Sequence, residues 1–138
     1  MQIHDYISKQ PAERQKLLNK LHEIIIQNDL TVIPVVESMM GKEMIIYKDR
    51  GMMKYALSGV IKYMSLHLLP IYGSLVLHAR YKTALNKASF QKGCINFENA
   101  EQIPLDIMKQ LIIDCSKIDL VKIREEYLKT KKEEKKKK

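Results

Sequence analysis

Residues 43–69, EMIIYKDRGMMKYALSGVIKYMSLHLL, carry the clearest structural signal of this 138-residue chain. Gly51 and Gly59 divide the stretch into short apolar segments, and the neighbouring Asp49 and Ser58 are residue types typical of turns. Together with Gly41, these glycines recur about every nine residues, and such short intervals leave no room for crossover helices. The stretch therefore predicts three antiparallel strands that follow one another as a meander.

Four stretches with apolar residues at helical spacing flank this meander. They are expected to run from Pro11 to about Asn28, from Ser74 to about Leu85, from Pro104 onward and from Asp119 onward. A further short strand is expected at CINF, residues 94–97. These elements predict an α+β fold, a two-layer sandwich in which an antiparallel sheet of about four or five strands carries its helices on one face.

The formal net charge of +8 is concentrated at the carboxyl end of the chain. Residues 129–138 hold seven lysines and two glutamates, whereas the other residues hold 17 basic and 14 acidic side chains. The last ten residues contain no apolar group, a composition typical of disorder. We expect a single domain over residues 1–128 and a disordered, lysine-rich tail over residues 129–138.

Targeting signals and cysteine usage point to one compartment. The opening segment MQIHDYISKQ lacks the apolar core of a secretory signal, and no apolar run is long enough to span a bilayer. Cys94 and Cys115 are too few for a disulfide framework. The sequence predicts a cytoplasmic protein with reduced thiols and no membrane association.

Common catalytic, metal and phosphate motifs are absent from the sequence. It contains no CxxC, HxH or HExxH for zinc, and no GxGxxG or GxxxxGK for phosphate. Cys94 lies in SFQKGCINF, residues 89–97, but a nucleophilic cysteine needs a base, a cation or a helix N-terminus beside it. The glycine before it indicates a chain turning into a strand. The sequence favours a binding protein over an enzyme.

Alternation along the predicted strands separates apolar from polar side chains. Residues two apart in a strand point to the same face, so Met64, Leu66 and Leu68 are expected to pack under the helices. In MMKYAL the same alternation places Met53, Tyr55 and Leu57 on the helix side, and together with CINF it leaves a second, uncovered face. Its polar and ionisable members are Lys54, Ser58, Tyr63, Ser65, His67 and Asn96. We predict that a ligand, ion or partner contacts this face.

Three sequence elements resemble the YdhG-like family, a group of small bacterial domains of unknown function. The segment from Asp5 through Pro11 to Leu18 fits the family pattern DYI-x-x-x-P-x-x-x-x-x-x-L, residues 92–97 fit its KG-x-I-x-F strand, and residues 104–105 fit its P-L helix start. The resemblance covers about residues 3–118. The chain departs from the family after Glu37, where SMMGKEMIIYK lacks an aromatic residue followed by proline, so a site at that segment is not carried over.

The resemblance implies a frataxin-like α/β sandwich, and one relative is regarded as an intracellular iron chaperone. Iron is therefore the cofactor that it implies, without named ligands. Because Lys92-Gly93 recurs in members that lack the cysteine, the resemblance also implies a turn entering a strand, with Gly93 supplying backbone freedom.

The sequence and the resemblance together predict a non-catalytic cytoplasmic binding module for a small ligand, a metal or a protein partner. Frataxin-like iron binding and delivery is the first alternative. Nucleic-acid association through phosphate contacts of the basic tail is the second, although the tail lacks the aromatic residues and arginines that stack on bases. A homo-oligomer is also compatible with the sequence.

Overall fold

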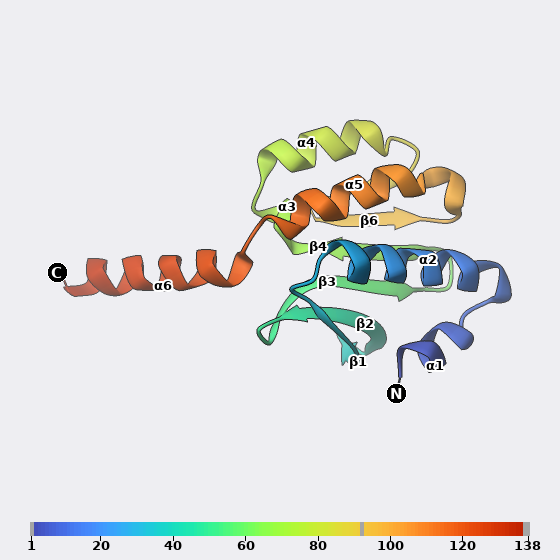
Figure 1. Cartoon of the computed structure of the whole chain (residues 1–138), viewed down its shortest axis with the longest axis horizontal. Helices are drawn as coiled ribbons and strands as arrows, with labels where there is room; N and C mark the ends of the chain where they lie inside the picture. Colours follow the sequence, from blue (N-terminus) through green and yellow to red (C-terminus); the bar gives the residue numbers. More distant parts are fainter. Residues whose placement is uncertain (1, 92, 137–138) are drawn as a thin grey trace.

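A computed structural model describes residues 2–91 and 93–136 of the chain, which form an α+β fold with an antiparallel sheet. The sheet has six strands in the order β1-β2-β3-β4-β6-β5 (Figure 1). Their bounds are β1 (Ile33–Met39), β2 (Lys42–Asp49), β3 (Met52–Gly59), β4 (Met64–Leu68), β5 (Ser89–Phe90) and β6 (Cys94–Phe97). The meander predicted for residues 43–69 is confirmed as β2, β3 and β4.

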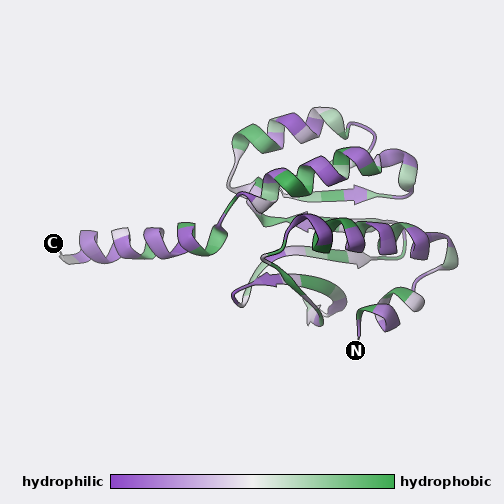
Figure 2. Ribbon diagram, in the orientation of Figure 1, coloured by the Kyte–Doolittle hydropathy of each residue, from purple (hydrophilic) through white to green (hydrophobic). Residues whose placement is uncertain are grey.

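The helices, except the last one along the chain, pack against one face of this sheet, and the last one extends away from the body (Figure 1). Their bounds are α1 (Ile3–Ser8), α2 (Ala12–Asn28), α3 (Leu69–Tyr72), α4 (Leu75–Ala84), the 3-10 turn η1 (Ala100–Gln102), α5 (Leu105–Ser116) and α6 (Leu120–Lys136). The main core lies between α2, α4 and α5 on one side and the inner residues of β2, β3, β4 and β6 on the other. Figure 2 shows the matching apolar stretches on the helices and strands.

The helix predictions are confirmed, and local chemistry explains where the helices begin. Pro11 and Pro104 are the N-cap residues of α2 and α5, where a missing N–H costs nothing. Ser74 caps α4, since its hydroxyl accepts a hydrogen bond from the Leu77 N–H at 3.2 Å. The Asp119 carboxylate accepts the Lys122 N–H at 3.0 Å and caps α6 in the same way.

Two tight turns hold the first three strands in register. Met40 and Gly41 connect β1 to β2, Arg50 and Gly51 connect β2 to β3, and all four residues have positive φ. Positive φ at both central residues is the type I′ geometry, whose twist matches that of a two-stranded hairpin. Because glycine reaches this region without steric cost, Gly41 and Gly51 fix these hairpins.

The sheet is larger than the four or five strands expected from the sequence. One unexpected strand is β1, whose Pro34 argues against a central strand but is tolerated at the sheet edge that β1 occupies. The other is β5, which pairs with β6 across the segment SFQKGCINF. That segment is therefore a hairpin of two short strands.

Gly93 plays a different role from the one implied by the resemblance. Its φ is not among the positive values of the described residues, so backbone freedom is not the reason for glycine here. A Cβ atom at Gly93 would lie 2.0 Å from the ring of Tyr72. The position needs glycine because the tyrosine ring lies against the backbone. Lys92, the other half of the expected turn, lies outside the described residues.

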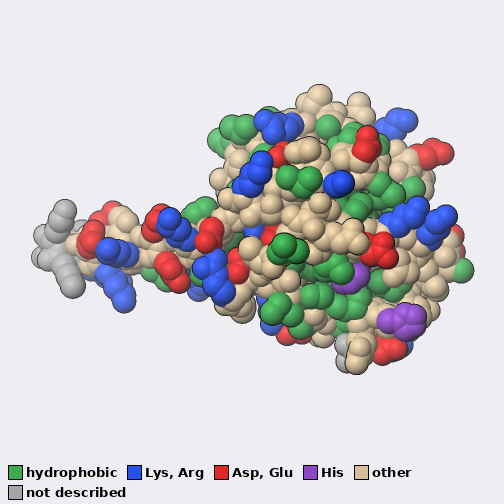
Figure 3. All heavy atoms as spheres, viewed as in Figure 1, with side chains coloured by type: hydrophobic (Ala, Val, Ile, Leu, Met, Phe, Trp, Pro, Cys, Tyr) green, Lys and Arg blue, Asp and Glu red, His purple; other side chains and the backbone are tan. Residues whose placement is uncertain are grey.

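The carboxyl-terminal segment carries helix α6, which includes part of the stretch expected to be a tail. Helix α6 continues through residues 129–136, while residues 137–138 lie outside the described part of the chain. Figure 3 shows α6 standing clear of the body, with basic and acidic side chains along its length. Spacing explains the helix, because lysine and glutamate are good helix formers and interact favourably three or four residues apart.

Candidate functional site

Three of the six residues predicted for the uncovered sheet face form a cross-strand row. Ser58 of β3 pairs with Ser65 of β4, and Ser65 pairs with Asn96 of β6. The Ser65 hydroxyl donates a hydrogen bond of 2.9 Å to Oδ1 of Asn96. Both serines are buried by their larger neighbours, so the row offers little polar surface to a ligand.

Tyr63 and His67 lie on either side of this row, two residues before and two residues after Ser65 along the chain. Tyr63 directly precedes β4, is partly exposed and lines a polar hollow with Asn96, Lys87 and Ser89. His67 is half-buried between the strands that carry Ala56 and Cys94. Burial lowers the pKa of His67 below its ordinary value, so the imidazole is mostly neutral at pH 7.

The prediction for Lys54 is wrong, because a β-bulge reverses its direction. Lys48 pairs with Met53 and Tyr47 pairs with Tyr55, so Lys54 is the extra residue between two register positions. Lys54 consequently turns to the helix side of the sheet, and Met53, which was expected there, turns to the uncovered face.

Lys54 ends in a buried polar cluster at the end of α2. Its Nζ lies 2.8 Å from Oδ2 of Asp29, and that oxygen also accepts a hydrogen bond of 2.7 Å from the Tyr55 hydroxyl. The second Asp29 oxygen accepts the Thr31 N–H at 3.0 Å. Burial alone would raise the pKa of Asp29, but the hydrogen bonds from Lys54, Thr31 and Tyr55 together lower it. With each polar atom paired, the cluster stabilises the fold and leaves no group for a ligand.

Cys94 lies on the uncovered face in a hydrogen-bonded position. Its Sγ is 3.0 Å from the Ser65 hydroxyl and donates to Oδ1 of Asn96 at 3.3 Å. The residue opposite is His67, which burial keeps neutral. Neither contact supplies the positive charge that stabilises a thiolate.

We therefore expect Cys94 to be alkylated by iodoacetamide at neutral pH no faster than an ordinary exposed cysteine. Mass spectrometry at a series of pH values measures this rate, and Cys115, fully buried in the core, serves as the unreactive internal reference. Rapid modification at pH 6 would show an activated thiol.

An apolar cluster occupies the β1–β3 half of the uncovered face, and strand parity had not indicated it. We call it the open-face cluster, and it consists of Val35, Met39, Met44, Ile46, Met53 and Ala56. All six residues belong to β1, β2 or β3, and no helix residue of the described chain contributes to the cluster. Met44, Ile46 and Ala56 are only 5%, 5% and 0% exposed and the other three are partly buried, so the cluster is a small second core and not an exposed surface. Half of the face expected to be polar is thus apolar and rich in methionine.

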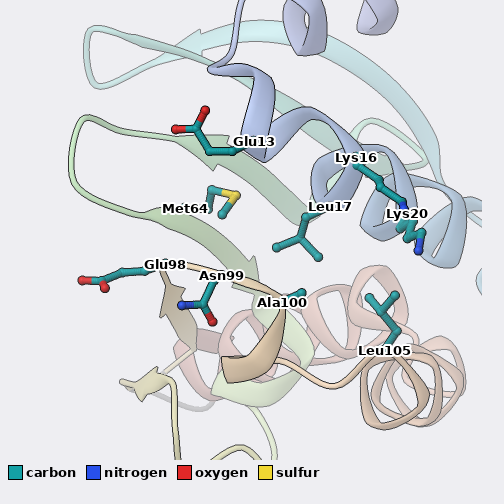
Figure 4. A pocket seen from close by; sticks show the side chains of 9 residues that line it. All are labelled: Glu13, Lys16, Leu17, Lys20, Met64, Glu98, Asn99, Ala100 and Leu105. Atoms are coloured by element: carbon teal, nitrogen blue, oxygen red, sulfur yellow. The ribbon is translucent and has the colours of Figure 1, made fainter.

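A well-formed pocket lies on the helix side, between α2 and the segment that links β6 to α5 (Figure 4). Its volume is about 340 Å³. Its lining residues are Glu13, Lys16, Leu17, Lys20, Met64, Glu98, Asn99, Ala100 and Leu105. The α2 residues share one side of that helix because they are three, four or seven positions apart.

The charges of the pocket are divided between its two ends. Lys16 and Lys20 lie at one rim of the pocket and Glu13 and Glu98 at the other, with their charged ends directed outward from its middle (Figure 4). Leu17 and Met64 are buried and form an apolar floor between them. The arrangement can hold a small molecule with an apolar body, a negative end and a positive end.

Sequence analysis missed this pocket because its walls come from distant segments. The charged residues of α2 had the spacing of an ordinary exposed helix face. The one usable signal was Glu98-Asn99 at the end of a strand, where Asn99 caps η1 by accepting the N–H groups of Glu101 and Gln102. That cap places Ala100 and Glu98 at the pocket.

The described residues form neither a metal-binding group nor a membrane-spanning helix. Residues 2–91 and 93–136 contain no group of three or more His, Cys, Asp or Glu side chains arranged to hold a metal ion. Within the same residues, no helix combines the length and hydropathy needed to cross a bilayer. Iron binding stays a prediction that rests on the resemblance alone.

The chain matches no protein-family model, and neither curated proteins nor solved structures include a detectable relative. The YdhG-like resemblance and the frataxin-like fold accordingly remain predictions, and the functional proposal rests on the residues themselves.

Proposed function

We propose that this protein is a non-catalytic binding module that holds a small zwitterionic molecule in the pocket between α2 and α5. The observation that carries the proposal is the separation of two lysines from two glutamates across an apolar floor. A free amino acid with an apolar side chain has the matching chemistry: a carboxylate for Lys16 and Lys20, an ammonium for Glu13 and Glu98, and a side chain for Leu17 and Met64.

The size and chemistry of the pocket support a small ligand. At about 340 Å³ it lies at the lower end of the range typical of ligand sites, roughly 300–1,000 Å³. Burial of the ligand's apolar part supplies most of the affinity, at about 25 cal/mol per Å². The exposed charges contribute about 0–1 kcal/mol each and set orientation and selectivity.

The lining residues also favour binding over catalysis. None of the nine is a His, Cys, Ser, Thr or Tyr, the residue types that most often act as nucleophile or proton shuttle. The nearest such constellation, Ser65, His67 and Cys94, lies on the other face of the sheet. The pocket therefore lacks a hydroxyl or thiol nucleophile paired with a histidine.

Calorimetric titration with three related probes tests the proposal. L-Leucine should bind. N-acetyl-leucine, which lacks the positive charge, and leucine amide, which lacks the negative charge, should each bind several-fold more weakly, since two lost exposed ion pairs amount to at most about 2 kcal/mol. Lys16→Gln with Lys20→Gln should produce the same loss for leucine and should no longer distinguish it from leucine amide.

The matched control is Lys82→Gln with Lys109→Gln, which removes two exposed lysines from α4 and α5 outside the pocket. This variant should bind leucine as the unmodified protein does. Equal weakening by both double variants would reduce the lysine effect to net charge and contradict the proposed site. Equal binding of all three probes would contradict the zwitterionic ligand.

A further inference from the structure

The polar hollow beside Tyr63 is a second concave site, located where β5 forms the edge of the sheet. Its volume is about 320 Å³. Each of its six lining side chains carries a hydrogen-bonding group, and the six are Tyr63, Lys87, Ser89, Asn96, Glu98 and Gln102. The hollow therefore gathers polar groups from segments that lie in or beside β4, β5, β6 and η1.

The cross-strand row of the uncovered face becomes accessible at this hollow. Ser65 of β4 pairs with Asn96 of β6, and Asn96 pairs with Ser89 of β5, so the three side chains share one face. Ser65 is buried, whereas Asn96 is partly buried and Ser89 is exposed. The inner end of the row is thus fixed by the sheet, and its outer end presents an amide and a hydroxyl group to solvent.

Two side-chain amides of the hollow are oriented by hydrogen bonds to their oxygen atoms. Oδ1 of Asn96 accepts the Ser65 hydroxyl at 2.9 Å and the Cys94 thiol at 3.3 Å. Oε1 of Gln102 accepts the backbone N–H of Glu98 at 2.7 Å. Because these bonds use the oxygen atoms, each amide keeps its NH₂ group, with two donors, for a ligand.

The lining favours an uncharged ligand that carries several hydroxyl groups. Lys87 and Glu98 are its only two charged residues, and their charges cancel. The side chains together supply ammonium and amide donors, a carboxylate acceptor and two hydroxyl groups that can both donate and accept. Tyr63, which is 39% exposed, adds an aromatic ring. A sugar has the matching chemistry, since its hydroxyl groups both donate and accept and its C–H groups can pack on a ring.

A nucleobase is another uncharged ligand that side-chain amides can bind, but this lining does not suit it. Proteins hold an isolated base by stacking it between aromatic or apolar side chains. Tyr63 is the only aromatic residue among the six, and none of the other five is apolar. The hollow therefore has one ring and no second apolar wall to hold a flat base.

We propose that the polar hollow is a second binding site of this protein and that its ligand is a neutral sugar. The site is distinct from the pocket between α2 and α5, although Glu98 lines both. Glu98 is therefore left unchanged in the variants that test the sugar site, so that leucine binding and sugar binding can be measured independently.

Two-dimensional ¹H–¹⁵N spectra of the full chain test the proposal during separate titrations with D-glucose, D-galactose and D-mannose. At least one of the three sugars should shift the amide signals of residues 87–89, 96–98 and 102, with a dissociation constant in the millimolar range or below. Uracil, the probe for a base site, should leave these signals unchanged.

Tyr63→Leu with Ser89→Ala removes the ring and one hydroxyl group of the hollow and should weaken the sugar at least fivefold. The matched control is Tyr127→Leu with Ser38→Ala, which removes one tyrosine and one serine from α6 and β1, outside the hollow, and should change the constant less than twofold. All four residues are exposed, so both variants should fold, as circular dichroism can verify. Neither variant alters the pocket between α2 and α5, so both should bind leucine as the unmodified protein does.

Three results would overturn the sugar site. The first is the absence of shift changes in the hollow with all three sugars. The second is a sugar affinity that Tyr63→Leu with Ser89→Ala leaves intact, or that the control variant lowers equally. The third is a larger response of residues 87–89, 96–98 and 102 to uracil than to any of the sugars, which would show a base site instead.

Discussion

Lys54→Met should lower the free energy of unfolding by roughly 3–5 kcal/mol, the usual cost of removing one partner of a buried ion pair. Lys54 is 1% exposed and Asp29 is 1% exposed, so the substitution leaves a carboxylate sealed from water without its cation. Urea unfolding, monitored by circular dichroism, gives the change in the free energy of unfolding from the midpoint and the slope of the transition.

The same substitution in an exposed pair provides the control. Lys48 on the neighbouring strand lies 2.7 Å from Glu37, and both side chains remain partly exposed, so Lys48→Met should cost no more than about 1 kcal/mol. Adding Asp29→Asn to Lys54→Met removes the uncompensated charge and should recover part of the lost stability. Equal losses for Lys54→Met and Lys48→Met would show that water reaches Asp29.

Leu111→Ala should destabilise the protein by about 2–5 kcal/mol, because it leaves a cavity in a well-packed core. Leu111 is fully buried on α5, and α5 packs against α2 above the sheet. Helix α2 forms one wall of the proposed pocket, and Leu105, the first residue of α5, belongs to the other, so the core and the pocket depend on the same packing.

Thermal unfolding compares the stability lost by Leu111→Ala with that lost by Leu75→Ala, the same substitution at an exposed position. Leu75 on α4 is 88% exposed, and its removal should change stability by no more than about 0.5 kcal/mol. A small loss for Leu111→Ala would mean that α5 is loosely packed, and the walls of the pocket would then be poorly defined.

Local patterns predicted much of the fold. The helices of residues 12–28, 75–84 and 105–116 follow from apolar spacing and from the caps at Pro11, Ser74 and Pro104. Strand alternation correctly placed Ser65, His67 and Asn96 on one face, because β4 and β6 pair without a bulge.

The remaining differences arise where one residue's position depends on distant parts of the chain. The bulge in β3 shifts the alternation by one, which turns Lys54 inward and Met53 outward. No local signal marks that bulge. The pocket could not be predicted for the same reason, because it depends on distant parts of the chain. Glu13 and Glu98 line one pocket only when α2 packs beside β6 and α5.

Backbone amide spectra during a leucine titration test the central claim most directly, because they report which part of the protein meets the ligand. We expect the largest ¹H–¹⁵N shift changes in residues 13–20 of α2 and 97–105 around η1. The amides of Ser58, Ser65 and His67 on the uncovered sheet face should remain unchanged. Shift changes centred on that face, or none at millimolar leucine, would contradict ligand binding between α2 and α5.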